Sequence, residues 1–350
     1  MFPTRALLQL VPACFLVPFA VSCAAQYSGP ESVEHDPAGD RYFVSNTVSG
    51  DILVRDQLGA LSSFVTVSPA PYGLEIMGDV LYACSGGSVK GYALSDGEQV
   101  FNRNLGGSFL NGITTDGTFL YATDFSSTRI YKVDVVNNTS SILVSNTAGT
   151  PNGIVWDPTG GRLVVVFWGN NAPIKSFNAI TGAAQTLVAN TGLGNVDGIT
   201  IDCLGNFLVA SWSPDRLTRF APDFASAGVN TGVTGLANPA DIDFDLVNNR
   251  VCVPNSGANS VTLSDVDCSN RIEERTAYTL HTMPNPTEGL VRFDPPMLTN
   301  EPFMVLDARG SLQGSGNLRA QAILDLGDLA PGIYTILFTR LAHQVRVVKE

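Results

Sequence analysis

The heptapeptide Pro151-Asn152-Gly153-Ile154-Val155-Trp156-Asp157 is the fullest copy of a pattern that recurs along the chain. Each copy joins a start of the Pro-x-Gly type to a short alternating apolar run, and successive copies begin 39 to 45 residues apart. The other five copies begin Pro30-Glu31-Ser32, Pro71-Tyr72-Gly73, Leu110-Asn111-Gly112, Val196-Asp197-Gly198 and Pro239-Ala240-Asp241. A period of this length predicts an architecture of repeated units.

Each repeat contains four strand-like runs separated by turn residues, and no helical periodicity interrupts the series. In the third copy these runs cover residues 111–115, 119–123, 129–133 and 141–144. Four strands in about forty residues is the unit of a β-propeller, so the six copies predict a six-bladed β-propeller over residues 26–270. Residues 273–278 or the start of the mature chain could supply the fourth strand of the last blade, and the sequence does not decide between them.

The 350-residue chain is acidic, with a formal net charge of -12. This charge argues against nucleic acid or an anionic membrane as a partner, because both require a basic surface. Residues 1–25 combine Arg5, an apolar run and the small residues Cys23-Ala24-Ala25, which predicts a signal peptide. A lipoprotein signal acylated at Cys23 is the alternative. We expect no transmembrane segment in the mature chain.

Four cysteines follow the predicted signal peptide, namely Cys84, Cys203, Cys252 and Cys268. An even number of cysteines in an exported protein permits disulfides, and three pairings are possible. Cys252 and Cys268 fall in the same repeat, which favours that pair. Ordinary buried thiols remain possible for the others.

The second place of each repeat start is the candidate functional position, because equivalent residues of the innermost strands lie at one height around a propeller axis. In chain order it holds Glu31, Tyr72, Asn111, Asn152, Asp197 and Ala240. Two carboxylates and two amides facing one point suit a hard cation that takes oxygen ligands. We therefore predict a metal site formed by Glu31, Asn111, Asn152 and Asp197. Calcium fits best, and another divalent cation remains possible.

A purely structural interpretation of the same residues is that Asn-Gly and Asp-Gly form hairpin turns. Against it, each pair is followed at once by the alternation of a strand, and Glu31 occupies the same place without any preference for turns.

The repeats resemble the gluconolactonase and senescence-marker-protein family over about residues 30–265. The matching motifs are Pro30-Glu31, the stretch from Pro151 to Pro158 and the stretch from Val196 to Asn206. The resemblance implies metal ligands at Glu31, Asn152 and Asp197, with Asn111 as a further ligand or a substrate contact. It also implies hydrolysis of a lactone or related ester, in which the metal polarises the carbonyl and Asp197 is the general base.

Two departures from the family concern the substrate. Phe109 stands where the family usually carries an arginine, and only Asp124 could replace an acidic residue that the family has in the next strand. A sugar-acid lactone is therefore harder to accommodate than a smaller or more apolar ester beside Phe109 and Tyr72. The alternative function is that of a non-catalytic propeller of the NHL type, whose ion braces the blades while a surface binds a protein or glycan at the cell surface.

His35 is the only histidine in the predicted propeller, so a histidine pair cannot be assembled. A Ser-His-Asp triad would have to use His35, and the sequence has no Gly-x-Ser-x-Gly motif. We expect His35 at a strand end near a turn. Trp156, Trp168 and Trp212 are interpreted as packing within the blades, although the loops that hold Trp168 and Trp212 could line a mouth.

Residues 281–350 lack the repeat and predict a small C-terminal β-sandwich after a linker at 271–280. This region resembles the C-terminal sorting domain of the type IX secretion system of Bacteroidetes. The matching stretches are Pro284–Gly289, Val305–Gly310, Leu326–Tyr334 and Val347–Glu350. The resemblance implies recognition by the type IX secretion machinery and passage through the periplasm. The protein would then be secreted or held at the outer cell surface.

Overall fold

The computed structural model describes residues 26–268, 281–294, 301–318, 323–338 and 343–350. The chain divides into two compact units, Met1–Arg271 (unit 1) and Ile272–Glu350 (unit 2). Both are all-β, and the described ranges contain no helix, hence none long and apolar enough to cross a membrane. The predicted signal peptide at 1–25 and the predicted linker at 271–280 lie outside the described residues.

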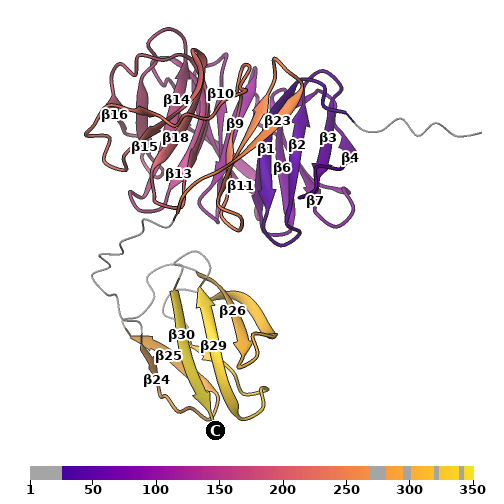
Figure 1. Ribbon diagram of the computed structural model, residues 1–350, viewed down its shortest axis with the longest axis vertical. Helices are drawn as coiled ribbons and strands as arrows, with labels where there is room; N and C mark the ends of the chain where they lie inside the picture. The colour runs from indigo at the N-terminus through magenta and orange to yellow at the C-terminus, as the bar shows by residue number, and fades with distance from the viewer. Residues whose placement is uncertain (1–25, 269–280, 295–300, 319–322, 339–342) are drawn as a thin grey trace, which may run out of the picture. The chain divides into compact units, whose positions relative to one another are not determined.

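Unit 1 contains six antiparallel sheets within the described ranges, each built from one contiguous stretch of chain (Figure 1). The first three sheets consist of β1 (Pro30–Asp36), β2 (Arg41–Asn46), β3 (Asp51–Arg55) and β4 (Leu61–Thr66); β5 (Pro71–Met77), β6 (Val80–Ser85), β7 (Ser88–Ala93) and β8 (Gln99–Asn104); and β9 (Leu110–Thr115), β10 (Leu120–Asp124), β11 (Arg129–Asp134) and β12 (Thr139–Val144).

The remaining sheets of unit 1 follow the same plan. They consist of β13 (Thr150–Asp157), β14 (Arg162–Trp168), β15 (Ile174–Asn178) and β16 (Ala184–Val188); β17 (Gly194–Ile201), β18 (Phe207–Ser213), β19 (Asp215–Phe220) and β20 (Val229–Asn230); and β21 (Asp243–Asp245), β22 (Arg250–Asn255) and β23 (Ser260–Asp265). The last sheet has three strands in the described chain, and residues 273–278, one predicted source of a fourth, lie outside it.

The first strands of successive sheets lie against one another, and β21 returns to β1. The backbone seals this last joint, because Asp241 N donates to Glu31 O at 2.8 Å and Val33 N donates to Asp241 O at 3.3 Å. A closed ring of radially arranged antiparallel sheets is a β-propeller.

The start of each repeat forms a β-bulge inside the first strand. The register against the second strand shifts between Pro151 and Ile154, and the first strands of the other four-stranded sheets shift at the equivalent place. In four of the six repeats a glycine follows the second place and allows neighbouring first strands to approach closely. A Cβ on Gly153 would lie 2.5 Å from the carbonyl oxygen of Asp197. The hairpin-turn interpretation is therefore wrong for these pairs.

Apolar side chains fill the space between neighbouring sheets, and the second strands are buried on both faces. Leu163, Val164 and Val165 in β14 are all 0% exposed and belong to a cluster shared by the third, fourth and fifth sheets. Continuous β-branched and aliphatic runs of this kind are typical of strands covered on both sides. They make the ring rigid enough to hold residues of different sheets in fixed positions.

The disulfide joins Cys203 to Cys268, not Cys252 to Cys268 as predicted. Strand alternation explains the difference. In β22, Val251 and Val253 pack in the same cluster as Cys203 and Cys268, whereas Cys252 points to the opposite face and packs beside Val44. Cys84 and Cys252 are buried free thiols.

Unit 2 contains two antiparallel sheets in its described residues, with one apolar core. The sheets consist of β24 (His281–Met283), β25 (Leu290–Asp294) and β28 (Leu324–Asp325); and β27 (Leu312–Leu318), β26 (Glu301–Asp307), β29 (Gly332–Phe338) and β30 (His343–Lys349). Val291 of the smaller sheet and Ile336 of the larger are both 0% exposed in that core, which gives the expected β-sandwich.

Candidate functional site

Glu31, Asn152 and Asp197 lie together at the starts of the first strands of three sheets. All three are buried, with exposed fractions of 9%, 2% and 2%. The carboxylate of Asp197 feels the charge of Glu31, and the side chain of Asn152 lies beside it. The bulges place these residues, because an extra residue in the strand turns its side chain toward the propeller axis. We call these three residues the donor set.

Two oxygens of the donor set have no hydrogen-bond partner in the described chain, namely Asn152 Oδ1 and Asp197 Oδ1. Asn152 Nδ2 is oriented by a weak bond of 3.4 Å to Val196 O. A buried acceptor without a partner costs about 1 to 3 kcal/mol, so its retention requires an explanation. Two carboxylates and an amide oxygen match the ligands that calcium takes in proteins. The donor set therefore fits a hard cation.

Electrostatics agrees with this assignment. Burial raises the pKa of Asp197 well above its ordinary value, and the nearby carboxylates of Glu31 and Asp241 raise it further. Burial also raises the pKa of Glu31 from 4.5 to about 7. Because like charges share a poorly solvated site, a divalent cation would relieve their repulsion.

Asn111, the fourth predicted ligand, occupies the equivalent place in β9 and is 4% exposed. The described interactions of Asp197 reach Glu31, Asn152, Asp241 and Trp212, and Asn111 is not among them. Ala240 supplies no donor atom at its place. The role of Asn111 as a ligand therefore stays a prediction.

A second group of acidic residues on the first strands was missed from the sequence. It consists of Glu34, Glu75, Asp241 and Asp243, all with raised pKa values caused first by burial and then by neighbouring carboxylates. The pKa of Asp241 rises to about 8, although the Ser32 hydroxyl, which donates to it at 2.9 Å, opposes the rise. Glu34, Glu75 and Asp243 occupy the fifth place of their repeats, so comparing that column would have found them.

The predicted substrate contacts Tyr72 and Phe109 pack edge to face, with ring centroids 4.6 Å apart. Burial raises the pKa of Tyr72, and so does the charge of Glu31, which places its ring beside the donor set. Trp156 packs against the main core as expected. Trp168 and Trp212 do not. Both side chains are half-buried, and their ring centroids lie 4.9 Å apart. Trp212 also lies beside Asp197.

Asp124 does not replace the acidic residue of the gluconolactonase pattern, because its carboxylate is already committed. It accepts backbone N–H bonds from Ser108, Phe109, Ser126 and Ser127. Burial alone would raise the pKa of Asp124, but these bonds outweigh it and lower the pKa. Asp124 therefore shapes the loops on both sides of it.

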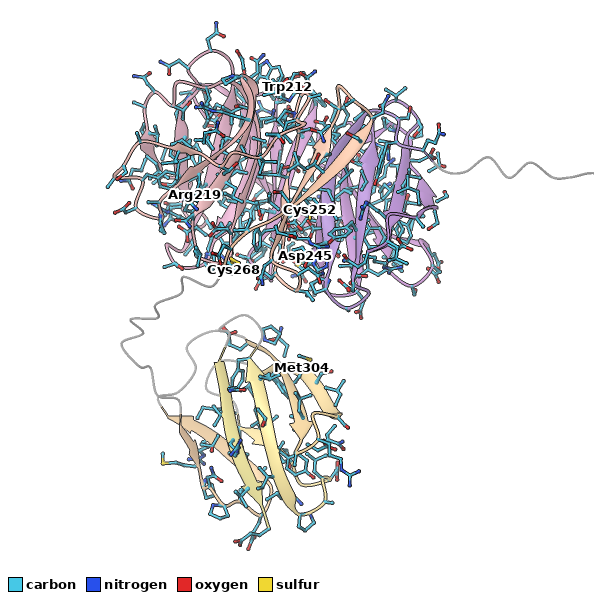
Figure 2. The ribbon with its side chains drawn as sticks, viewed as in Figure 1. Trp212, Arg219, Asp245, Cys252, Cys268 and Met304 are labelled. Carbon is cyan, nitrogen blue, oxygen red and sulfur yellow. A yellow bond between two sulfur atoms is a disulfide. The ribbon has the colours of Figure 1, made fainter. Side chains whose placement is uncertain are left out.

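His35 is the penultimate residue of β1, near a turn as expected, and is 5% exposed. Its Nε2 lies 3.4 Å from Asp245 Oδ1 and 3.5 Å from Asp40 Oδ1. Both oxygens already accept two hydrogen bonds, from the Val247 and Asn248 amides and from the Gln57 and Asn248 side chains respectively. This cluster joins the first and last sheets, at the end of the strands opposite Trp212 (Figure 2).

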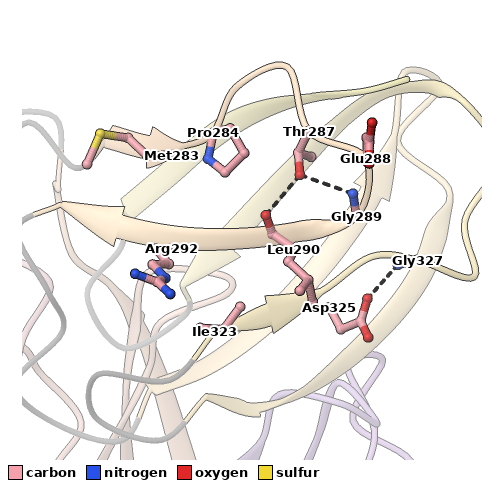
Figure 3. A pocket seen from close by; sticks show the side chains of 10 residues that line it. All are labelled: Met283, Pro284, Thr287, Glu288, Gly289, Leu290, Arg292, Ile323, Asp325 and Gly327. Atoms are coloured by element: carbon pink, nitrogen blue, oxygen red, sulfur yellow. Dashed lines mark hydrogen bonds between the residues drawn. The ribbon is translucent and has the colours of Figure 1, made fainter.

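Unit 2 carries a surface pocket beside β25. Its lining includes Met283, Leu290, Arg292, Ile323 and Asp325. Figure 3 shows the Thr287 hydroxyl donating to Leu290 O and accepting from Gly289 N, so it braces the loop that forms one wall.

The sequence matches no protein-family model and no curated protein. Solved structures do match. A structural-genomics target named as a gluconolactonase is 18% identical over 67% of this chain and 88% of that one, with a TM-score of 0.55. Virginiamycin B lyase from Staphylococcus aureus is 14% identical over 69% and 85%, with a TM-score of 0.51. A chain of a nidogen/laminin complex is 20% identical over 64% and 92%, with a TM-score of 0.51. At such identities the likeness shows the β-propeller fold alone.

Proposed function

We propose that unit 1 is a metal-dependent hydrolase of a lactone or related ester, with calcium held by Glu31, Asn152 and Asp197. The observation that carries this proposal is the pair of buried, unpartnered oxygens on Asn152 and Asp197. Residues with only a packing role would be expected to give both oxygens hydrogen-bond partners. A gluconolactonase and a lyase among the structural neighbours show that this fold carries enzyme sites in other proteins.

The residues of the donor set would have different roles in the reaction. Asp197 would accept a proton from the attacking water, the role of a general base. Glu31 and Asn152 would hold the cation together with Asp197, and Asn111 would contact the substrate or complete the ligand set. When bound, the cation would supply a Lewis acid that polarises the ester carbonyl.

We also propose that unit 2 is a type IX sorting domain and that residues 1–25 are a signal peptide. The motifs from Pro284 to Gly289 and from Leu326 to Tyr334 support this, as does the β-sandwich that holds them. The protein would then pass through the periplasm and work outside the cell. Its other partner would be a small ester or lactone.

The test measures calcium content by elemental analysis and calcium affinity by calorimetry on the full chain. We expect about one equivalent in the wild type, and its loss in the Glu31→Gln and Asp197→Asn variants. Glu98→Gln and Asp79→Asn are matched controls, because both side chains are exposed and remote in sequence from the donor set. A panel of lactones and esters follows, with turnover expected in the wild type and lost in Asp197→Asn.

Each outcome has a distinct meaning. Calcium binding without turnover of any ester would overturn the enzyme assignment and favour the bracing ion of a non-catalytic, NHL-type propeller. Absence of bound calcium, manganese and zinc alike would overturn the metal site itself.

A further inference from the structure

Five aromatic side chains form one continuous series around the donor set. The series, here called the aromatic arc, runs through Tyr72, Phe109, Phe125, Trp168 and Trp212. Successive ring centroids lie 4.6, 5.4, 6.0 and 4.9 Å apart, and the planes of successive rings are inclined by 54° to 80°. These are the spacings of attractive, tilted ring contacts.

The two ends of the aromatic arc meet the two carboxylates of the donor set. Tyr72 lies beside Glu31, and Trp212 lies beside Asp197. Trp212 is fixed by its indole N–H, which donates to Pro239 O at 3.1 Å. The arc therefore borders the donor set from the second sheet to the fifth.

Four of the five rings of the aromatic arc lie outside the hydrophobic core, and Tyr72 packs against its edge. All five rings are half-buried, and Phe109, Phe125, Trp168 and Trp212 belong to none of the apolar clusters formed by the described residues. Contiguous exposed aromatic surface is unfavourable in water and marks binding sites.

The protein also holds this surface in place. Phe125 N donates to Phe109 O at 2.9 Å, and Asp124 binds the amides on both sides of these rings. Rings held by such bonds lose little further freedom on binding a ligand. The loops of the arc are thus preorganised.

From this geometry we infer that the site takes an uncharged lactone or ester that carries a planar aromatic ring, which packs on the arc while its carbonyl faces the donor set. The tilted rings expose both faces and edges, and these suit another aromatic ring. The arc consists of aromatic rings alone, so it offers no charged group to pair with an ionised substituent on the ligand. The hydrolysis of this ligand rests on the proposed function, whereas its binding does not.

A sugar lactone fits the arc poorly, because its hydroxyl groups need hydrogen-bond partners. The arc offers one hydroxyl, on Tyr72, and two indole N–H groups, one of which Trp212 already donates to Pro239. A sugar ring would therefore leave most of its hydroxyls facing hydrocarbon.

Binding is tested with lactams, which resist hydrolysis. Calorimetry on the full chain with added calcium compares 3,4-dihydroquinolin-2-one with δ-valerolactam, which lacks the fused benzene ring. We expect the aromatic lactam to bind at least tenfold more tightly, and Trp168→Leu and Phe125→Leu to remove about tenfold of that preference. Phe101→Leu is the matched control, because its ring contacts Tyr82 edge to face in the same way but lies outside the arc.

Turnover is tested with dihydrocoumarin and δ-valerolactone. Their leaving groups differ, so the readout is the change in their kcat/KM ratio between variants. Trp168→Leu should lower this ratio about tenfold, because only dihydrocoumarin carries the ring that packs on the arc. Lactam binding that depends on the arc, without turnover of either lactone, would support the ligand class and overturn only the hydrolase proposal. Turnover of both lactones with no effect of arc variants, or a preference for D-glucono-1,5-lactone, would overturn the inference.

Discussion

The two ends of the first strands treat buried aspartates in opposite ways. At the end where these strands finish, Asp36 accepts bonds from the Ala38 and Gly39 amides and from Arg41 Nε. Asp245 likewise accepts from Tyr42 and from the amides of the following turn. At the end where the strands start, Asp197 keeps one oxygen without a partner.

Burial does not account for this difference, because Asp245 is 0% and Asp197 2% exposed. Burial alone would raise both pKa values. Hydrogen bonds from Tyr42 and Asn248 outweigh it at Asp245 and lower the pKa there, whereas the charges of Glu31 and Asp241 add to it at Asp197. A buried carboxylate with partners holds the fold together, and one without them is available to a ligand.

The largest expected effect is a difference in stability between variants of the two aspartates, Asp245 and Asp197. Asp245→Ala leaves the Tyr42 hydroxyl and two backbone amides without their acceptor, which should lower the free energy of unfolding by about 3 to 4 kcal/mol. In a chelating buffer, Asp197→Asn should cost less than about 1 kcal/mol, because Asp197 Oδ1 accepts no hydrogen bond that the substitution would break. Urea unfolding measures both, and equal losses would contradict the comparison.

The disulfide offers a second way to separate stability from binding. Cys268→Ser should lower the free energy of unfolding by about 2 to 4 kcal/mol, since it frees a loop with a sequence separation of 65 residues. Calcium affinity should stay within twofold, because Cys203 and Cys268 lie outside the donor set. A reductant should destabilise the wild type and Cys252→Ser but not Cys268→Ser. A Cys252→Ser protein that no longer responds to reductant would contradict the pairing.

A smaller effect is expected from pH. The folded-state pKa of Glu31 is raised from 4.5 to about 7, so its contribution to stability is complete below pH 4.5 and is lost as the pH rises through 7. In chelator the free energy of unfolding should therefore fall between pH 5 and pH 8. The Glu31 part is about 3 kcal/mol at most. Glu31→Gln should flatten this slope and excess calcium should oppose it. An unchanged slope in Glu31→Gln would show that other groups cause it.

Much of the fold could be predicted from the sequence, because local patterns determine it. Turn residues and alternation mark the four-stranded sheets, and the period of about forty residues marks the propeller. The sequence could not show why position 153 requires glycine, because the reason is the close approach of the Asp197 carbonyl in the next sheet. The predicted disulfide was wrong for a related reason. Membership of one repeat does not say to which face of β22 a cysteine points.

The placement of Glu31, Asn152 and Asp197 at the starts of first strands could be predicted, because one column of the repeat holds them, and their role as metal ligands stays a prediction. The sequence could not predict roles that depend on how far a side chain is buried or on which hydrogen bonds it makes. Trp168 and Trp212 have the composition of core residues, and only their exposure and mutual contact distinguish them. Similarly, Asp124 is a plausible catalytic acid in sequence and a saturated acceptor in the structure.

The way the ring closes has a consequence for the order of assembly. Each sheet of unit 1 comes from a contiguous stretch, so it can form soon after its residues leave the ribosome. The joint between Glu31 and Asp241 must wait until more than two hundred residues have emerged. Because Glu31 belongs to the first sheet and Asp197 to the fifth, no ring of fewer than five sheets contains the donor set. Capture of the cation would therefore come late in folding and could not guide its earlier steps.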